Sequence, residues 1–441
     1  MMSNVEEPPD LFADVRIRHL WGTFIFAIGS SMVGIVTSYL IYQQSGSVAV
    51  TGLIVVCSNL PTLLLPGPAT YLARVWGGPK LYVYSRTAIG FVGLIPVVLS
   101  LLGDLTTASL LLWYLLTGIL YALSGSATGL VRAMIAPPGK VPEFNGALGR
   151  FGSAGTIIGL LLGGGIYALF GPTWVFLFGA LASMIEGLSV VRILKRAPIK
   201  AQPREPFRQG IAVIRGNTEM RAACIFSAWC FIVGGYAVTL PAIASSIGTN
   251  AEYLSILQTA SIVGGLGLGW AMGKIHGRVG WGWTQRICFF LFGLSLLSIS
   301  LVLRQHGSAT FTLLTTALLL VPVGFTINMN ITILGSIVQV FAPSGSRNSV
   351  MTAYAVIPAL FIPIGQETIG FVADGLSVGS ALGMIGVIVM VMLLIDPRRT
   401  MREAIDALDE STAPPPMAPA YVSGPETPDV DGIEESLDEV G

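Results

Sequence analysis

The stretch Arg74-Val75-Trp76-Gly77 recurs about two hundred residues later as Lys274-Ile275-His276-Gly277. An arginine follows each copy at the same spacing, Arg86 in the first and Arg286 in the second. Internal repeats of this kind are typical of membrane transporters built from two homologous halves that enclose a site. The repeat therefore predicts two related membrane halves, and a secondary transporter is the leading hypothesis for the function.

The composition of the chain indicates that most of it lies in lipid. Of its 441 residues, 53% are hydrophobic and 11% are charged, and the mean hydropathy is +0.75. Soluble domains carry about 25% charged residues. This composition excludes a soluble enzyme, and a formal net charge of zero without a basic stripe argues against nucleic acid as a partner.

Twelve apolar stretches are long enough to cross a bilayer as helices, which takes about 20 residues each. They are 20–43, 48–72, 81–102, 108–131, 147–170, 173–194, 222–247, 252–273, 283–303, 309–336, 348–372 and 376–396. Lipid offers the backbone no hydrogen bonds, and these stretches are too long for barrel strands, so helices are expected. The sequence thus predicts an all-α polytopic membrane protein with six helices in each half.

Basic residues gather on one side of the predicted helices. Lys80 follows the second span, Lys140 follows the fourth, and the central connection around Arg204 is rich in arginine. On the other side Arg304 is the single basic residue. Because Lys and Arg mark cytoplasmic loops, we expect a multi-pass protein of the cell membrane with both termini in the cytoplasm.

Five segments follow from these patterns. They are a cytoplasmic N-terminal segment (1–18), a six-helix bundle (19–196), a cytoplasmic linker (197–221), a second six-helix bundle (222–397) and an acidic cytoplasmic tail (398–441). In the linker, Phe207, Ile211 and Ile214 recur at helical spacing beside arginines, which predicts a short amphipathic helix on the membrane surface; an unstructured tether is the alternative. The tail has little to bury and is predicted to be disordered.

No catalytic, metal or cofactor site is expected. The four cysteines, Cys57, Cys224, Cys230 and Cys288, fall in predicted helices without metal-site spacing, and the three histidines lie near span ends. The chain has no Walker A, H-E-x-x-H or G-x-S-x-G motif. The sequence therefore predicts a protein that is not an enzyme.

The loop from Thr70 to Lys80 resembles the G-x-x-x-D-R-x-G-R-R signature of the major facilitator superfamily, and Gly269 to Arg278 is similar to its second-half counterpart. The stretch from Ala127 to Gly171 resembles spans four and five of the twelve-helix branch that includes bacterial drug, macrolide and siderophore exporters. The resemblance covers most of residues 16–396. It implies the fold of that superfamily, in which two six-helix bundles related by a pseudo-two-fold axis enclose a central cavity.

The same signature implies a gate at the cytoplasmic ends of spans two, three, eight and nine. Cationic side chains there can pair with helix carbonyls and carboxylates in one state and release them in another. The candidates for gating and interface roles are Arg74, Gly77, Lys80, Arg86, Lys274, Gly277, Arg278 and Arg286. Simple anchoring of the topology is the alternative for Arg74 and Lys80, whereas Arg86 and Arg286 lie further into their helices, where a charge is costly.

Glycine recurs every four residues in two predicted helices, at Gly155, Gly159 and Gly163 and again at Gly265, Gly269 and Gly273. Such stripes lie on one face of a helix and let two backbones approach closely. The resemblance implies that these helices, spans five and eight, meet at the boundary between the halves. Spans two and eleven are implied to meet there as well, and their prolines predict kinks.

Two carboxylates lie well inside predicted spans, Glu186 and Glu367. Burial disfavours the charged form of a carboxylate, so both are candidates for proton coupling. Glu367 is the preferred candidate because it follows Pro363 and Gly365, where a broken helix can open a pocket that contains water. The alternative interpretation of Glu367 is that it simply reaches water at the outer face. For Glu186, pairing with a group on a neighbouring helix is the favoured interpretation.

The resemblance implies that spans one, four, seven and ten line the central cavity. The substrate-cavity candidates, with one residue of span eleven added, are uncharged: Tyr39, Tyr114, Tyr121, Trp229, Tyr236, Asn328, Asn330 and Gln366. An anionic substrate would need cationic partners there. The set therefore indicates a small amphipathic organic molecule, and helix packing is the alternative role for each residue.

The sequence favours a secondary active transporter that exports such a molecule by alternating access, with proton coupling left open. An importer of a neutral nutrient and a transport-inactive membrane protein that acts through a partner are the alternatives. The expected partners are the lipid bilayer, a small-molecule substrate and protons, and we expect a monomer.

Overall fold

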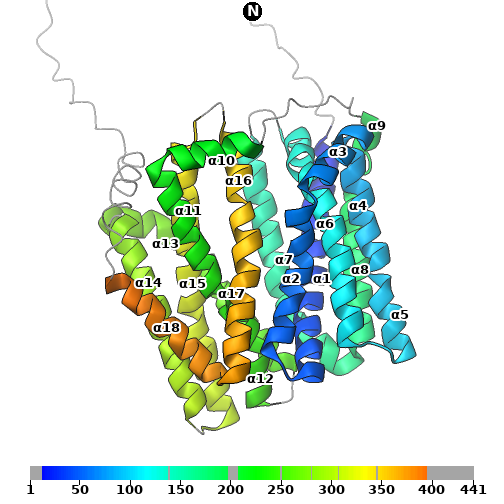
Figure 1. Ribbon diagram of the computed structural model, residues 1–441. Helices are drawn as coiled ribbons and strands as arrows, with labels where there is room; N and C mark the ends of the chain where they lie inside the picture. The colour runs from blue at the N-terminus through cyan, green and yellow to red at the C-terminus, as the bar shows by residue number, and fades with distance from the viewer. Residues whose placement is uncertain are drawn as a thin grey trace, which may run out of the picture.

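The computed structural model describes residues 12–137, 140–196, 207–248, 251–279, 281–305, 307–343 and 346–394. Helices make up nearly all of these ranges, and none of them contains a strand. The acidic tail (398–441) and residues 197–206 of the linker lie outside the described residues. The all-α class and the arrangement as two helical bundles are confirmed (Figure 1).

The first bundle contains the helices that precede the linker. They are α1 (Ala13–Ser45), α2 (Val48–Leu64), α3 (Pro66–Trp76), α4 (Gly78–Val92), α5 (Leu94–Leu102), α6 (Thr107–Ile135), α7 (Val141–Phe170), α8 (Pro172–Ser189) and the short α9 (Ile193–Arg196). Within this bundle α1 packs against α7 and α8, while α4 packs against α6 and α8.

The second bundle repeats the plan. It contains α11 (Thr218–Val233), the 3-10 helix η1 (Gly234–Thr239), α12 (Leu240–Ile247), α13 (Ala251–Val279), α14 (Trp281–Arg304), α15 (Ala309–Phe341), α16 (Arg347–Tyr354), α17 (Val356–Gly375) and α18 (Val378–Leu394). The two bundles contact each other along α2 with α17 and along α7 with α13, the two pairs of spans that the resemblance implies.

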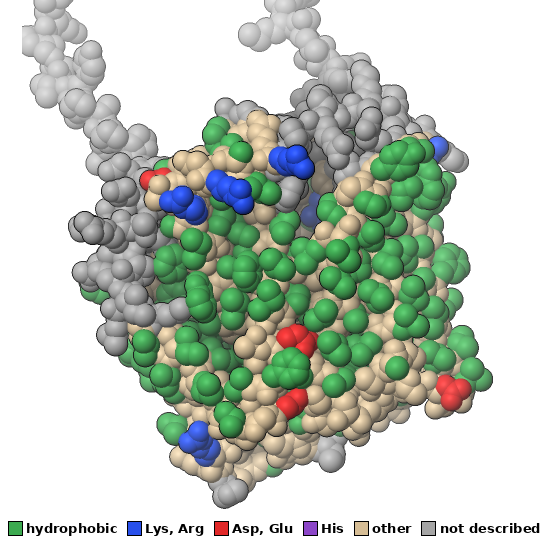
Figure 2. Space-filling view, viewed as in Figure 1, with side chains coloured by type: hydrophobic (Ala, Val, Ile, Leu, Met, Phe, Trp, Pro, Cys, Tyr) green, Lys and Arg blue, Asp and Glu red, His purple; other side chains and the backbone are tan. Residues whose placement is uncertain are grey.

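The helix α10 (Phe207–Gly216) is the amphipathic helix predicted in the linker. It lies across one end of the second bundle, packed against α16 (Figure 1). We call this the α10 end of the molecule, and it also carries the start of α1. The other end, which carries α12, is called the α12 end. Lys and Arg side chains gather over α10, and hydrophobic side chains cover the flank between the two ends (Figure 2).

Each of the twelve predicted spans coincides with a helical stretch. Over the described part of the chain, nine such stretches are long and apolar enough to cross a membrane, and the bent pair α2 and α3 makes a tenth. The two remaining predicted spans are α13 and α18, and α18 forms a shorter apolar helix. These apolar helices account for the multi-pass character of the protein.

Several spans are broken into two helices. The axis turns by 61° between α2 and α3, where Pro66 and Pro68 occupy the first turn of the second piece. Pro66 cannot donate a backbone hydrogen bond, which favours a break here, although α2 itself runs through Pro61 without one. The predicted kink of span two is therefore present. Span eleven is likewise divided, at Ala355, into α16 and α17, and Pro358 lies in the first turn of α17.

The first helix starts earlier than the predicted span. It begins at Ala13, inside the segment that the sequence assigns to the cytoplasm. Asp14 is paired with Arg192 at 2.7 Å, and the Arg16 guanidinium donates to the carbonyl of Ile135 at 3.0 Å. These polar contacts hold the first turns of α1 against the bundle. Hydropathy alone does not predict a helix there.

The glycine stripe of α7 faces its own bundle, although α7 itself lies at the boundary between the halves. A Cβ atom on Gly155 or Gly159 would collide with backbone carbonyls of α1, at Phe24 and Ile28. The stripe is thus the seam between α7 and α1. The neighbouring Gly164, offset from the stripe by one residue, faces α13 across the boundary, because adjacent helical positions point about 100° apart.

Candidate functional site

A cavity of about 310 Å³ lies between the bundles near their middle. It is lined by Ser153 of α7, by Gly234 and Tyr236 of η1, by Ser261, Ile262 and Gly265 of α13, and by Ile327 and Asn328 of α15. All of these residues except Ser153 belong to the second bundle. The cavity is at the lower end of the size range of small-molecule sites.

Asn328 presents a hydrogen-bond acceptor to this cavity. Its side-chain Nδ2 donates to the carbonyl oxygen of Gly324 at 2.8 Å. A carbonyl can only accept, so the amide nitrogen must face Gly324 and Oδ1 remains available to a ligand. Gly265 makes room for this amide, because a Cβ there would lie 2.8 Å from Nδ2.

Hydroxyl groups supply the other polar contacts. The hydroxyls of Tyr236 and Ser261 are 2.8 Å apart, so one of them donates to the other and one proton remains for a ligand. Ser153 brings a third hydroxyl from the opposite bundle. Ile262 and Ile327 form the apolar part of the wall. The cavity can therefore hold a molecule with both hydrogen-bonding and apolar surface.

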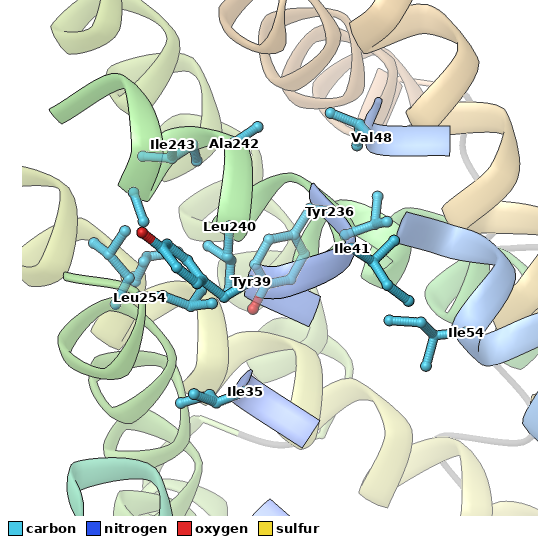
Figure 3. Close-up of a cluster of buried hydrophobic side chains, with 14 of the residues drawn as sticks. Ile35, Tyr39, Ile41, Val48, Ile54, Tyr236, Leu240, Ala242, Ile243 and Leu254 are labelled. Carbon is cyan, nitrogen blue, oxygen red and sulfur yellow. The ribbon is translucent and has the colours of Figure 1, made fainter. Parts of the chain in front are cut away.

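Three of the predicted cavity residues lie elsewhere. Tyr39 is 4% exposed and packs edge-on against Tyr167, within a buried cluster that also contains Ile41 and Leu240 (Figure 3). Asn330 is 1% exposed and bonds back to Thr326, and Trp229 is exposed on the surface of α11.

Three further candidates do not line the cavity either. Tyr114 packs beside Trp113 against the core, and Tyr121 contacts Arg86. Gln366 is half-buried in α17, where its backbone passes close to Gly235. Of the eight cavity candidates, Tyr236 and Asn328 are those that line the cavity.

Arg86 is the centre of a buried charged cluster in the first bundle. Its guanidinium is 3.2 Å from the Glu186 carboxylate, and Tyr82 donates to the same carboxylate at 3.3 Å. The guanidinium also lies over the rings of Phe26 and Tyr121, 5.1 Å from each centroid. Pairing on a neighbouring helix, the interpretation favoured for Glu186, is what the structure shows.

The remaining gate candidates are placed less uniformly. Gly77 joins α3 to α4 with φ +83°, a left-handed conformation that favours glycine, and Lys80 is exposed. The repeat counterpart of Gly77 is Gly277, which lies inside α13. Because α13 continues to Val279, the two copies of the motif differ in local structure. The side chains of Arg74, Lys274 and Arg278 lie outside the described part of the chain.

Glu367 stands at the seam between the bundles. One of its carboxylate oxygens, Oε1, is buried and has no hydrogen-bond partner among the described residues. The same oxygen faces Gly52 of α2, where a Cβ would come within 2.9 Å of it, and Val238 of η1 lies beside that position. Oε1 thus lies between elements of both bundles, although Glu367 as a whole is only half-buried.

Sequence reasoning missed Ser153, Ser261 and Asp374. The two serines belong to spans five and eight, which the resemblance does not assign to the cavity. Asp374 falls between the predicted spans 348–372 and 376–396, but the structure places it in the last turn of α17, where it forms hydrogen bonds across the boundary to Ser47 and the first turn of α2. A serine before an apolar run is a helix-cap signal, but nothing in the sequence indicates which distant carboxylate completes the cap.

Comparisons with known proteins agree with this architecture. The family model of the Major Facilitator Superfamily matches residues 20–366. A search of curated proteins finds no match. Among solved structures, a bacterial homologue of the human lysosomal transporter Spinster, inward-facing and unoccupied, has a TM-score of 0.59 at 12% identity, covering 90% of this chain and 96% of that one.

Two other solved structures are similar over almost their whole length. The nucleoside transporter NupG has a TM-score of 0.64 at 13% identity, covering 87% of this chain and 98% of that one. A bacterial homologue of the iron transporter ferroportin, inward-facing, has a TM-score of 0.63 at 15% identity, with 86% and 98% covered. At these identities the likeness concerns the fold.

Proposed function

Because this chain belongs to the Major Facilitator Superfamily, we propose that it exports a small, uncharged or weakly charged amphipathic molecule by alternating access. The observation that carries the substrate class is the lining of the 310 Å³ cavity, which holds no charged residue among those described. An anionic or cationic substrate would enter such a cavity without a counter-charge, at a high desolvation cost. A molecule with one hydrogen-bond donor for Asn328 and an apolar face for Ile262 and Ile327 fits the groups present.

In this proposal the protein lies in the cell membrane, and its α10 end faces the cytoplasm. Arg208 and Arg215 of α10 are exposed there, whereas the α12 end carries Asp104, Glu252 and Asp374. Basic residues on the cytoplasmic side support this orientation. The bundles are hydrogen-bonded to each other at the α12 end, which under this orientation is the outer end and would be closed.

Proton coupling through Glu367 is the second part of the proposal. A charged carboxylate with a buried oxygen that no donor satisfies is strongly disfavoured. Protonation of Glu367 removes that charge in the state in which α2 and α17 are in contact. Separation of the two helices would admit water to the carboxylate and allow the proton to leave. Glu186 is less suited to this role because Arg86 already compensates its charge.

A comparison of deletion and overexpression strains tests the function. Under export, deletion should raise the intracellular amount of one or more small molecules or increase susceptibility to amphipathic compounds, and overexpression should do the reverse. Depletion on deletion would indicate import instead, and no change in either strain would favour a protein that acts through a partner.

The cavity is tested with Asn328→Leu, which removes the acceptor at similar volume. We expect it to abolish export of any compound identified in that comparison. Thr332→Val is the matched control, since Thr332 lies one turn further along α15, does not line the cavity, and bonds back to its own helix. Equal loss in both variants would remove the support for this cavity as the binding site.

A further inference from the structure

Asp374 joins the two bundles by capping a helix that belongs to the other bundle. It lies in the last turn of α17, and its Oδ1 accepts from the backbone N–H of Val48 at 2.7 Å. Its Oδ2 accepts from the hydroxyl of Ser47 at 2.6 Å and from the N–H of Ala49 at 3.1 Å. Ser47 is itself the N-cap of α2 and accepts from Val50. We call Asp374 with these partners in Ser47–Ala49 the α2–α17 latch.

The charge of Asp374 is placed where it is most favourable. The N–H groups of the first helical turn have no partner inside the helix, and they carry the positive end of the helix dipole. Hydrogen bonds to a charged acceptor are roughly twice as strong as neutral ones. The latch therefore supplies a charged acceptor to the N–H groups of the first turn of α2. These hydrogen bonds would be lost whenever α17 moved away from α2.

Close backbone packing supports the latch. Gly370 stands one turn before Asp374, and a Cβ on it would lie 2.7 Å from the Cα of Ala49. No side chain of Gly370 separates α17 from α2 at this level, so the carboxylate reaches the helix start without distortion. Figure 1 shows the two helices side by side where the bundles meet.

The other boundary between the bundles has a similar contact. Ser255 of α13 accepts a hydrogen bond from the backbone N–H of Gly164 in α7 at 3.0 Å. In both cases a side chain of the second bundle accepts from the backbone of the first bundle, and both contacts lie at the α12 end. Of the two, the latch has more hydrogen bonds and involves a carboxylate, so it is the stronger connection.

We propose that the α2–α17 latch is the main polar element holding the transporter closed at its α12 end. Opening that end requires α17 to leave α2, which breaks the three hydrogen bonds of Asp374 and exposes the N-terminal N–H groups of α2. The strength of the latch thus sets the population of the state open at the α12 end. The inference goes beyond the proposed function, since it depends on a two-state motion and not on the identity of the substrate.

The test measures the distance between the bundles at the α12 end. The full-length protein, with its four native cysteines replaced, carries spin labels at Asp104→Cys and Gln305→Cys, which are exposed positions of the first and second bundle. Double electron–electron resonance in lipid nanodiscs then reports the two populations. Asp374→Ala should raise the long-distance population roughly tenfold, as expected for loss of hydrogen bonds to a charged group.

Two further variants complete the series. Asp374→Asn keeps an acceptor but loses the charge and should give an intermediate shift, and Ser47→Ala should give the smallest one. Ser377→Ala is the control, because its hydroxyl bonds within the start of α18. If the Asp374 variants are not obtained in folded form, Ser47→Ala decides the question. Distance distributions equal to those of the parent protein in folded variants would overturn the proposal, whatever the result of the transport experiment.

Discussion

Arg86 and Arg286 are equivalent in the internal repeat, yet of the two only Arg86 is paired with a carboxylate in the described part of the chain. Glu186 lies 3.2 Å from Arg86, whereas the Arg286 guanidinium lies over the exposed ring of Trp283, 5.3 Å from its centroid. The position equivalent to Glu186 in the second half is Gly386. The first arginine is thus part of a buried network, and the second resembles an interfacial anchor. Their surroundings therefore differ, and a gating role for each of them stays a prediction.

The Arg86 pair yields a prediction on stability. Arg86→Ala leaves the carboxylate of Glu186, which is 3% exposed, buried without its partner. Removing one member of a buried ion pair costs about 3–5 kcal/mol, so thermal unfolding in detergent should occur at a clearly lower temperature. Arg286→Ala is the matched control and should change the stability by less than about 1 kcal/mol. Equal unfolding temperatures for the two variants would contradict the assignment of Arg86 to a buried pair.

The seam between α1 and α7 yields a second prediction. A Cβ on Gly159 would lie 2.9 Å from the Cα of Ile28 and would meet its carbonyl oxygen even more closely. Gly159→Ala must push the two backbones apart, and overpacking of this kind costs about 1–3 kcal/mol. Gly165→Ala is on the same helix with nothing within 4 Å of the added atom, so it should be neutral or slightly stabilising. The thermal stabilities of the two purified variants decide between these expectations.

A third prediction concerns orientation. A reporter that is active only in the cytoplasm should function when it is fused near Arg204 or after Arg402, two positions outside the described residues. A single cysteine at Asp104, which is exposed at the α12 end, should react with a membrane-impermeant thiol reagent added outside the cell. Labelling of a cysteine at position 204 from outside would reverse the assignment of the two ends.

A fourth prediction separates binding from energy coupling. Glu367→Gln mimics the protonated carboxylate, so substrate exchange in liposomes should persist while accumulation driven by a pH gradient is lost. Glu252→Gln changes an acidic residue near the α12 end, outside the α2–α17 seam, and should retain accumulation. If Glu367→Gln still concentrates substrate with the same dependence on external pH, the proton is carried elsewhere, and Glu186 or the substrate itself becomes the next candidate.

Much of the fold was predictable because the membrane imposes local rules. Each span needs a sufficient run of apolar residues, and this property can be read directly from a stretch such as Ala309–Phe341. The helix break at Pro66 followed from the same local chemistry. The start of α1 was placed too late because Asp14 and Arg16 are held by contacts with distant residues, which hydropathy does not register.

The candidate site was predictable only in part. Tyr236 and Asn328 line the cavity described above, and the resemblance assigns their helices to a central cavity. Tyr39 does not line this cavity, because a tyrosine on a cavity helix can equally face a neighbouring helix, and here it faces Tyr167. Ser153 gave no signal, since one serine among many small residues does not reveal the direction in which its helix is turned.

The amino-acid chain alone was enough to indicate the membrane environment, the helical class, the twelve apolar stretches and the repeat that divides them into halves, since all of these depend on local composition and on self-similarity. Only the tertiary structure decided which side chains meet across the halves. Ser153 lines the same cavity as Asn328, and Asp374 bonds to the start of α2. This division arises because a helix surrounded by lipid and by apolar neighbours is hydrophobic on every face. Its rotation is then set by packing and by a few polar contacts with distant helices, and no local pattern records which contacts those are.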